Sequence, residues 1–298
     1  MSSELVSAEW LLSRLGRPGI VVLDATVWLS HPLSDGDFRA TSGWQSWSDR
    51  HIPTSRHADL IADFADPTGT THFARPDPAD LARRIAEYGI GAEDTVVAYD
   101  CDGGIWAARL WWMLRAVGVR VRVLDGGWSQ WVAIGGPVAN GDDSQQHSTI
   151  SREVLVAGRD SHAWVELDEV ERVMTGDLDG MLVCALGAQA FAGTTPTRYA
   201  RRGHIPGSIN VPARGLVDDQ YRLLPPTLLQ QRLAPLLRDR RPALIYCGGG
   251  ISATLLALAL TELGRSDVRV YDGSLDEWTA DPRRPISATF AGRSTETT

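Results

Sequence analysis

The sequence predicts an α/β protein built from two tandem copies of one domain, each a mostly parallel sheet with helices on both faces. Short apolar β runs alternate with helical segments through the chain, a pattern typical of parallel sheets that are covered on both sides. The chain also repeats itself: Val123-Leu-Asp-Gly-Gly-Trp-Ser-Gln-Trp131 returns as Val270-Tyr-Asp-Gly-Ser-Leu-Asp-Glu-Trp278, and His51-Ile-Pro53 returns as His204-Ile-Pro206. Matched motifs in one order indicate that the two halves share a fold.

The same elements are expected in the same order in both copies. The predicted strands are Ile20–Leu23, Thr95–Tyr99 and Arg120–Leu124 in the first copy, and Met181–Val183, Ala243–Tyr246 and Val268–Tyr271 in the second. Helices are predicted at Ile105–Val117 and Thr254–Leu263, each after a glycine-containing loop. Reactive loops in such folds lie at the carboxyl ends of strands, so these two loops are the candidate sites.

The domain boundaries follow from composition. We expect an N-terminal domain at 1–138 and a C-terminal domain at 151–286. Residues 139–150 are polar and lack periodicity, which predicts a linker, and the Ser/Thr-rich residues 287–298 predict a disordered tail. The N-terminus has no apolar signal core, so we expect a cytoplasmic protein.

Bulk properties narrow the function class. The net charge of −8 argues against nucleic acid or an anionic membrane as a partner, because phosphate binding needs clustered basic residues. Three cysteines are too few, and odd in number, for a disulfide framework. The seven histidines are scattered and none pairs with cysteine at zinc-ligand spacing, so we expect neither a metal nor a cofactor.

The segment around Cys247 is the most informative part of the chain. Cys247 stands between a buried strand and an apolar helix and is followed by three glycines, which let a loop turn its N–H groups inward. Such N–H groups and the helix N-terminus favour the thiolate, which is the nucleophilic form of cysteine. An ordinary buried cysteine in a tight turn is the alternative. Ala253 stands where cysteine-dependent phosphatases need an arginine, which disfavours phosphatase chemistry.

These motifs resemble the tandem-domain rhodanese family, the thiosulfate and 3-mercaptopyruvate sulfurtransferases. The resemblance covers nearly the whole chain and rests on His51-Ile-Pro53, the segment 203–212, the loop after Cys247, and Tyr271-Asp-Gly-Ser274 with Trp278. It implies an inactive first domain and a catalytic cysteine in the second. The loop is most similar to the mercaptopyruvate branch, because the basic residues that follow the cysteine in the thiosulfate branch are missing.

The resemblance also implies a mechanism. Cys247 takes the sulfane sulfur of 3-mercaptopyruvate or thiosulfate as a persulfide and passes it to cyanide or to a thiol, for which a thioredoxin-like protein is one candidate. Asp59 and His72 match catalytic residues that the first domain contributes. The substrate-binding residues expected in the second domain are Gly248, Gly249, Gly250, Ile251, Ser252 and Arg198.

Some positions depart from the family pattern. Leu186 and Ala190 replace two arginines, the first of which binds the anionic group of the donor, and Gly249 replaces a residue with a hydroxyl group. These losses keep open an alternative from another class, a weakly active or inactive rhodanese module that carries sulfur or binds a partner. Cys101 is a second, weaker candidate for a sulfur site, because Cys101 and Ile105 have the same spacing as Cys247 and Ile251.

Substitution of Leu186 tests how the donor is bound. A hydrogen bond to a charged group contributes about 1.5–3 kcal/mol, so Leu186→Arg is expected to lower KM for both donors by about tenfold to a hundredfold. The value of kcat should change less, because the contact holds ground and transition states alike. Steady-state kinetics with each donor measure this. An unchanged KM in Leu186→Arg, together with a sharp rise in Arg198→Ala, would place the anion on the other loop.

Overall fold

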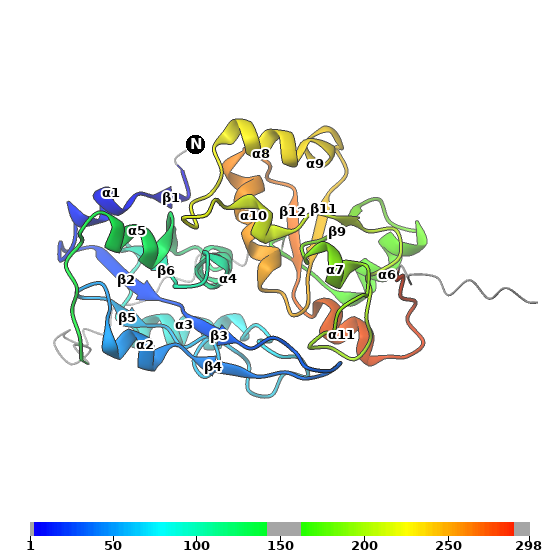
Figure 1. Cartoon of the computed structure of the whole chain (residues 1–298), viewed down its shortest axis with the longest axis horizontal. Coiled ribbons are helices and arrows are strands. Elements are labelled where there is room, and N and C mark those ends of the chain that lie inside the picture. The colour runs from blue at the N-terminus through cyan, green and yellow to red at the C-terminus, as the bar shows by residue number, and fades with distance from the viewer. Residues whose placement is uncertain (1–2, 142–161, 289–298) are drawn as a thin grey trace, which may run out of the picture.

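Two five-stranded sheets, one from each half of the chain, lie side by side in the computed structural model, which describes residues 3–141 and 162–288 (Figure 1). The strand order is β1-β7-β6-β2-β5 in the first sheet and β10-β9-β11-β12-β8 in the second, and every neighbouring pair is parallel. Read from β8, the second order repeats the first element by element. The predicted tandem α/β fold is therefore confirmed.

The elements of the first domain alternate along the chain. They are β1 (Leu5–Val6), α1 (Ala8–Leu12), β2 (Ile20–Asp24), β3 (Val27–Leu29), β4 (Ala40–Ser42), α2 (Trp44–Asp49), β5 (Arg56–His57), α3 (Pro78–Glu87), β6 (Thr95–Tyr99), α4 (Ile105–Ala116), β7 (Arg120–Leu124) and α5 (Gly127–Ala133).

The second domain repeats this arrangement with different short elements. They are β8 (Trp164–Val165), α6 (Leu167–Thr175), β9 (Met181–Cys184), α7 (Ala188–Phe191), β10 (Ile209–Asn210), the 3₁₀ turn η2 (Ala213–Leu216), α8 (Pro226–Arg232), α9 (Ala234–Arg238), β11 (Ala243–Tyr246), α10 (Ser252–Glu262), β12 (Val268–Tyr271) and α11 (Ser274–Ala280).

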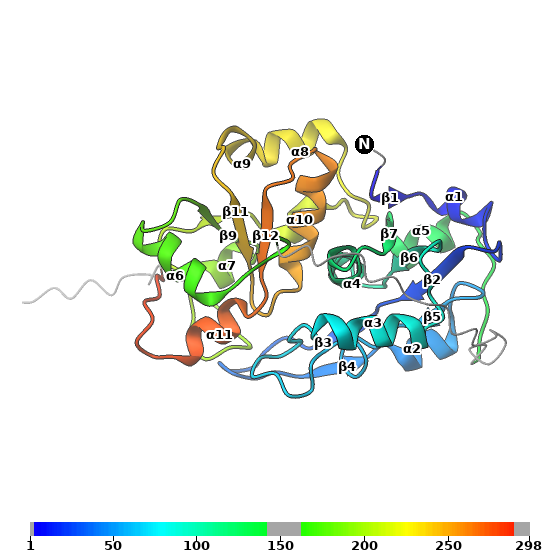
Figure 2. The ribbon, with the colours of Figure 1, turned by 180° about the vertical axis from the view of Figure 1, so that it is seen from behind.

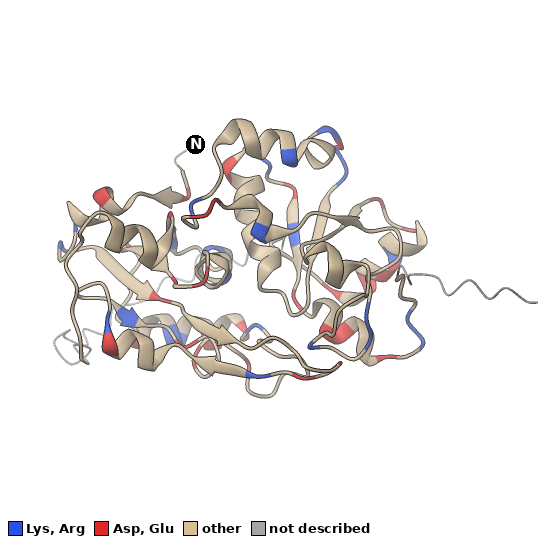
Figure 3. Ribbon diagram, in the orientation of Figure 1, with Lys and Arg blue, Asp and Glu red and all other residues tan. Residues whose placement is uncertain are grey.

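All six predicted strands and both predicted helices are present, with ends that differ by at most two residues. The antiparallel β3–β4 hairpin and the two-residue edge strands had no signal in the sequence, because segments this short show no periodicity. No helix in the described part of the chain is long and apolar enough to cross a membrane. Both signs of charge occur on both domains (Figure 3).

The predicted linker and tail lie largely outside the described residues. Of the linker at 139–150, Ala139 exchanges backbone hydrogen bonds with His51, and the N–H of Gly141 donates to Ser48. Of the tail at 287–298, Ser287 forms a bridge with His204. The domain boundaries themselves stay a prediction.

The two domains share one core, at whose centre α4 packs against α10 (Figures 1 and 2). Trp106, Trp111 and Trp112 on α4 are fully buried, as expected for tryptophans that pack the core and the domain interface. Both helices are apolar on all sides, which is typical of helices buried between two layers.

Arg109 is a deeply buried charged residue on α4 and is only 1% exposed, whereas Arg115 in the last turn is partly exposed. Its guanidinium reaches across the interface, where Nη1 pairs with Asp272 at 2.5 Å and approaches the carbonyl oxygen of Gly250 at 3.4 Å. Its Nη2 donates to the carbonyl oxygen of Phe73 at 2.7 Å. A buried charge needs such partners, so Arg109 fixes the distance between α4 and the second domain.

We expect Arg109→Ala to lower the free energy of unfolding by about 3–5 kcal/mol, because it leaves Asp272 without its buried partner. Arg83→Ala is the matched control, since Arg83 pairs with Asp80 on the surface, where such a pair contributes about 0–1 kcal/mol. Urea unfolding followed by circular dichroism measures both. Equal losses in the two variants would contradict a structural role for the buried pair.

Candidate active site at the domain interface

Cys247 directly follows β11, a central strand of the second sheet, and lies in the turn that leads to α10. The residue is 2% exposed. We call residues 247–251 the cysteine loop. Ser274 at the start of α11 fixes both ends of this loop, because its Oγ accepts from the N–H of Cys247 at 3.1 Å and of Gly250 at 3.0 Å. Ser274 has a φ of 49°, a strained conformation for a residue with a side chain.

The three loop glycines meet different surroundings. Gly250 has a φ of +74°, and a Cβ there would lie 2.8 Å from the carbonyl oxygen of Asp272, so only glycine fits. A Cβ on Gly249 would lie 3.5 Å from the carbonyl oxygen of His72, and one on Gly248 would lie 3.5 Å from the ring of Tyr199. These are ordinary contact distances, so the loop is closely covered without being sterically closed at these two positions.

In the first domain, the loop after β6 binds a carboxyl group. Tyr99 and Tyr246 end corresponding strands and face Asp24 and Cys184 in the same register, so Asp100 is the positional counterpart of Cys247. The carboxyl oxygens of Asp100 accept from the N–H groups of residues 102, 104, 106 and 107 at 2.8–2.9 Å. Burial raises the pKa of Asp100, while these N–H groups act to lower it.

N–H groups at the corresponding chain positions follow Cys247, although the backbone differs at one of them, since Gly104 has a φ of 80° and Ile251 a φ of −87°. These N–H groups belong to Gly249, Ile251 and Ala253, and none of them has an acceptor among the described residues. The second domain thus has N–H groups without acceptors at the chain positions that hold a carboxyl group in the first. Cys101 stands one position after the counterpart of Cys247, so the matched spacing to Ile105 does not reflect structural equivalence.

His72 lies at the edge of the cysteine loop, where the first domain covers the second. Its backbone N–H and its Nδ1 both contact Asp276 Oδ2, at 2.7 and 2.8 Å, and its ring stacks on Phe38. Its carbonyl oxygen faces Gly249. The structure therefore brings His72 to the site, while its catalytic role stays a prediction.

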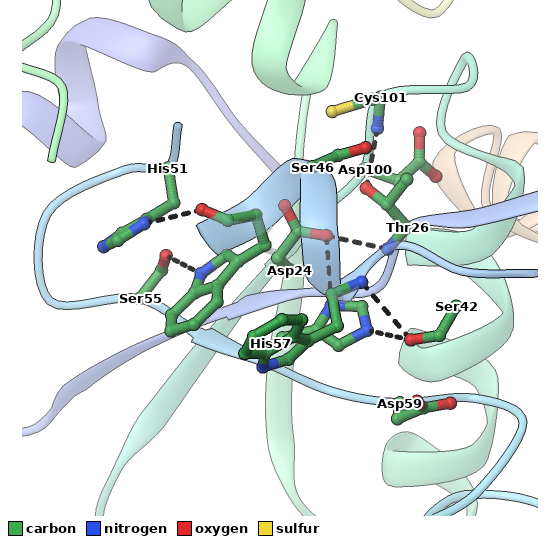
Figure 4. A network of polar contacts seen from close by, with 12 residues as sticks. Asp24, Thr26, Ser42, Ser46, His51, Ser55, His57, Asp59, Asp100 and Cys101 are labelled. Carbon is green, nitrogen blue, oxygen red and sulfur yellow. Dashed lines mark hydrogen bonds and ion pairs between the residues drawn. The ribbon is translucent and has the colours of Figure 1, made fainter. Parts of the chain in front are cut away.

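Asp59 lies in a polar network of the first domain (Figure 4). His57 Nε2 is 3.0 Å from Ser42 Oγ, and His57 Nδ1 is 3.6 Å from Asp24 Oδ1. Burial acts to raise the pKa of Asp59, but hydrogen bonds from Ser42 and from the N–H groups of residues 61 and 62 lower it below its ordinary value. These partners all belong to the first domain, and the catalytic role of Asp59 remains a prediction.

The candidate anion-binding positions occupy two loops. Arg198 donates through Nε at 3.0 Å and through Nη2 at 2.5 Å to the carbonyl oxygen of Ser30, and burial lowers its pKa, as does the nearby Arg214. Leu186 follows the carboxyl end of β9, and its carbonyl oxygen accepts from Asn210. Binding of a donor by Arg198 stays a prediction, since two of its nitrogens already contact the first domain.

Sequence reasoning missed three residues that shape the site. The sequence offered an indication for Arg109, because this arginine stands within the most apolar part of its helix. Ser274 was noted only as the last residue of the Tyr-Asp-Gly-Ser motif. No pattern in the sequence indicated that Tyr199 lies near the site. Their contacts to the loop join residues that are far apart in the sequence, and local patterns do not report such contacts.

Comparisons with known proteins agree with this geometry. A family model described as a rhodanese-like domain matches residues 7–134 and 193–281. A Pseudomonas aeruginosa protein named probable 3-mercaptopyruvate sulfurtransferase is 32% identical over 293 residues, which cover 96% of this chain and 98% of the relative. The thiosulfate sulfurtransferase of Gallus gallus is 33% identical over 282 residues and 92% of both chains.

A solved structure shows the same architecture. SseA from Escherichia coli, described among the 3-mercaptopyruvate sulfotransferases, matches with a TM-score of 0.77 and 27% identity, over 92% of this chain and 99% of that one. The two matched regions fall on the two sheets, and the relatives align over nearly their whole lengths. On this evidence the chain belongs to the tandem rhodanese sulfurtransferase family.

Proposed function

We propose that this chain transfers a sulfane sulfur from 3-mercaptopyruvate or thiosulfate to a thiol or cyanide through a persulfide on Cys247. The observation that supports this most is the set of backbone N–H groups in the turn after Cys247 that have no acceptor among the described residues, at positions whose counterparts bind a carboxyl group in the first domain. The relatives named for these two donors support the substrate class. The acceptor is a small thiol, cyanide or a thioredoxin-like protein, and the compartment is the cytoplasm.

The first half-reaction forms one bond and breaks another. The Cys247 thiolate attacks the sulfane sulfur, and an S–S bond forms. With mercaptopyruvate the C–S bond breaks, and pyruvate leaves as an enolate that takes up a proton. With thiosulfate the bond to the sulfonate breaks, and sulfite leaves. The loop N–H groups stabilise the negative charge on the thiolate and then on the persulfide.

The second half-reaction restores the enzyme. The acceptor, a thiolate or cyanide, attacks the outer sulfur of the persulfide, and Cys247 leaves as a thiolate. Donor and acceptor thus react in turn, which predicts ping-pong kinetics. Gly249, Ile251 and Ala253 are proposed to provide the N–H groups, and Gly248, Gly250 and Ser252 to complete the substrate-binding loop, whose Gly250 N–H donates to Ser274. His72, Asp59 and Arg198 are the side chains proposed to assist the donor.

A weakly active or inactive sulfur carrier is the second candidate function. Two observations favour a carrier. Cys247 is only 2% exposed, and the apolar Leu186 follows the end of the neighbouring strand β9. Steady-state assays with both donors, and with cyanide and a thiol as acceptors, separate the two. A folded protein that takes up sulfur but turns over neither donor would be a carrier.

The other two thiols are poor nucleophiles. Burial, reinforced by Asp24, raises the pKa of Cys101 to about 12. Burial also raises the pKa of Cys184 to about 12. Because the thiolate is the reactive form, both side chains are almost entirely protonated at neutral pH. The raised pKa values therefore disfavour Cys101 and Cys184 as the residue that accepts the sulfur.

Mass spectrometry tests the nucleophile. After incubation with mercaptopyruvate or thiosulfate, the wild-type protein should gain one sulfur atom on the peptide that contains Cys247. The Cys247→Ser variant should gain none, and Cys101→Ser should behave like the wild type. Sulfur found on Cys101 or Cys184 in the Cys247→Ser variant would overturn the assignment.

Alkylation checks the raised pKa values of Cys101 and Cys184. In folded Cys247→Ser protein, Cys101 and Cys184 should resist iodoacetamide at pH 7–8 and react only as the pH approaches their raised pKa of about 12. Unfolding in urea removes the burial and should expose both thiols at pH 8–9, which serves as the control. Rapid labelling of either thiol in the folded protein at pH 7 would contradict the raised values.

A further inference from the structure

Tyr199 is a buried residue against the cysteine loop that the proposed mechanism does not use. It is 5% exposed, and its ring atoms Cε1 and Cδ1 lie 3.5 and 3.6 Å from the position that a Cβ on Gly248 would occupy. Its hydroxyl is buried and has no hydrogen-bond partner among the described residues. A buried hydroxyl without a partner costs free energy, and in a native protein it calls for an explanation.

Other buried tyrosines show that this fold does satisfy such groups. The hydroxyl of Tyr246 donates to Ser208 at 2.7 Å and accepts from the N–H of Ile205 at 3.0 Å. The hydroxyl of Tyr88 donates to Asp63 at 2.7 Å. Tyr199 and Tyr271 are exceptions, since neither buried hydroxyl has a hydrogen bond among the described residues, and Tyr199 is the one whose ring lies against the cysteine loop.

Two sulfur atoms lie near the Tyr199 hydroxyl. Burial is the main cause that raises its pKa well above the ordinary value, and the thiols of Cys184 and Cys247 add to this effect. The phenol thus stays protonated at neutral pH and acts as a hydrogen-bond donor rather than as a base. Of the two thiols, Cys247 is the one whose persulfide would carry new negative charge.

The backbone around Tyr199 is fixed from the first domain. Residues 30–39, the segment between β3 and β4 that we call the strap, contact the residues on both sides of the tyrosine. Asp35 accepts from the N–H of Thr197 at 3.1 Å and from Arg202 at 2.8 Å, and Ser30 accepts from Arg198. The ring is thereby held in place before a donor binds, as a preorganised hydrogen-bond donor requires.

From this arrangement we infer that the Tyr199 hydroxyl donates a hydrogen bond to the sulfur carried by Cys247 and stabilises its negative charge during transfer. The inference rests on the proposed persulfide chemistry and adds a side-chain donor to a loop whose residues 248–250 are all glycine. No proton is transferred: the O–H bond stays intact while the S–S bond forms and the bond to the leaving group breaks.

Tyr199→Phe removes only the hydroxyl and tests the inference. A hydrogen bond to a charged group has an effect of about tenfold to a hundredfold, so kcat/KM and the rate of persulfide formation should fall by that factor. Tyr271→Phe is the matched control, because its hydroxyl is also buried in the second domain, where the charged group that acts on it most is Glu277 rather than a cysteine. That variant should keep the wild-type rate.

A second substitution that restores a hydroxyl group distinguishes a catalytic role of Tyr199 from a packing role. A side chain fits at Gly249, where a Cβ meets only the carbonyl oxygen of His72 at 3.5 Å, so Gly249→Ser places a hydroxyl two residues after Cys247. In the Tyr199→Phe background this change should restore much of the lost rate. A purely structural defect at Tyr199 would not respond to a hydroxyl at another position.

Three results would overturn the inference. One is an unchanged rate in Tyr199→Phe, and another is an equal loss in Tyr199→Phe and Tyr271→Phe. The third is a Cys184→Ala variant that reproduces the loss, because the hydroxyl would then serve Cys184. If the wild-type protein itself gains no sulfur on Cys247, the proposed function fails instead, and the two failures are told apart by that measurement.

Discussion

The buried ion pair between Arg109 and Asp272 joins the two domains at the back of the cysteine loop. Its guanidinium contacts a carboxylate and a loop carbonyl of the second domain, and also the carbonyl of Phe73, next to His72. An unpaired charge at this depth would be costly, so the pair allows few alternative arrangements of the domains. The shape of the loop, the position of His72 and the packing of α4 on α10 therefore depend on one another. This explains why a domain without a counterpart cysteine is still part of the site.

Arginine supplies several of the polar contacts across this interface. All 29 basic residues of the chain are arginines, and the planar guanidinium can donate to several oxygens at once. Arg75 pairs with Glu166, Arg202 with Asp35, and Arg214 with Asp102, each across the domain boundary. These pairs are partly exposed and individually weak. Together they hold the strap and the loop after β5 against the second domain, and they surround the cysteine loop with residues of the first.

The two halves show how one backbone serves two purposes. In both, a strand ends in tyrosine and a loop turns its N–H groups toward the next residue before a buried helix begins. In the first half that residue is Asp100, whose own carboxyl group uses the N–H groups and ties the loop to itself. In the second half it is Cys247, and three of the N–H groups that follow it have no acceptor within residues 3–141 and 162–288. The difference between a structural turn and a candidate active site thus rests on one side chain.

Periodicity, glycine positions and the internal repeat were enough to predict the tandem parallel sheets, the strands that form their centres and the loop that contains Cys247. These features are local or repeated, so the linear sequence carries them. The equivalence of Asp100 with Cys247 was not drawn, because the spacing from cysteine to isoleucine suggested Cys101. The internal repeat already implied it, since Tyr99 and Tyr246 end corresponding predicted strands, and the register of β6 and β11 confirms the position. The β3–β4 strap, the role of Ser274 in fixing the loop, and the approach of Arg109 and Tyr199 to the loop glycines were decided by tertiary structure. They depend on contacts between residues that are distant in the chain, and on which buried polar group finds a partner, which no local pattern encodes.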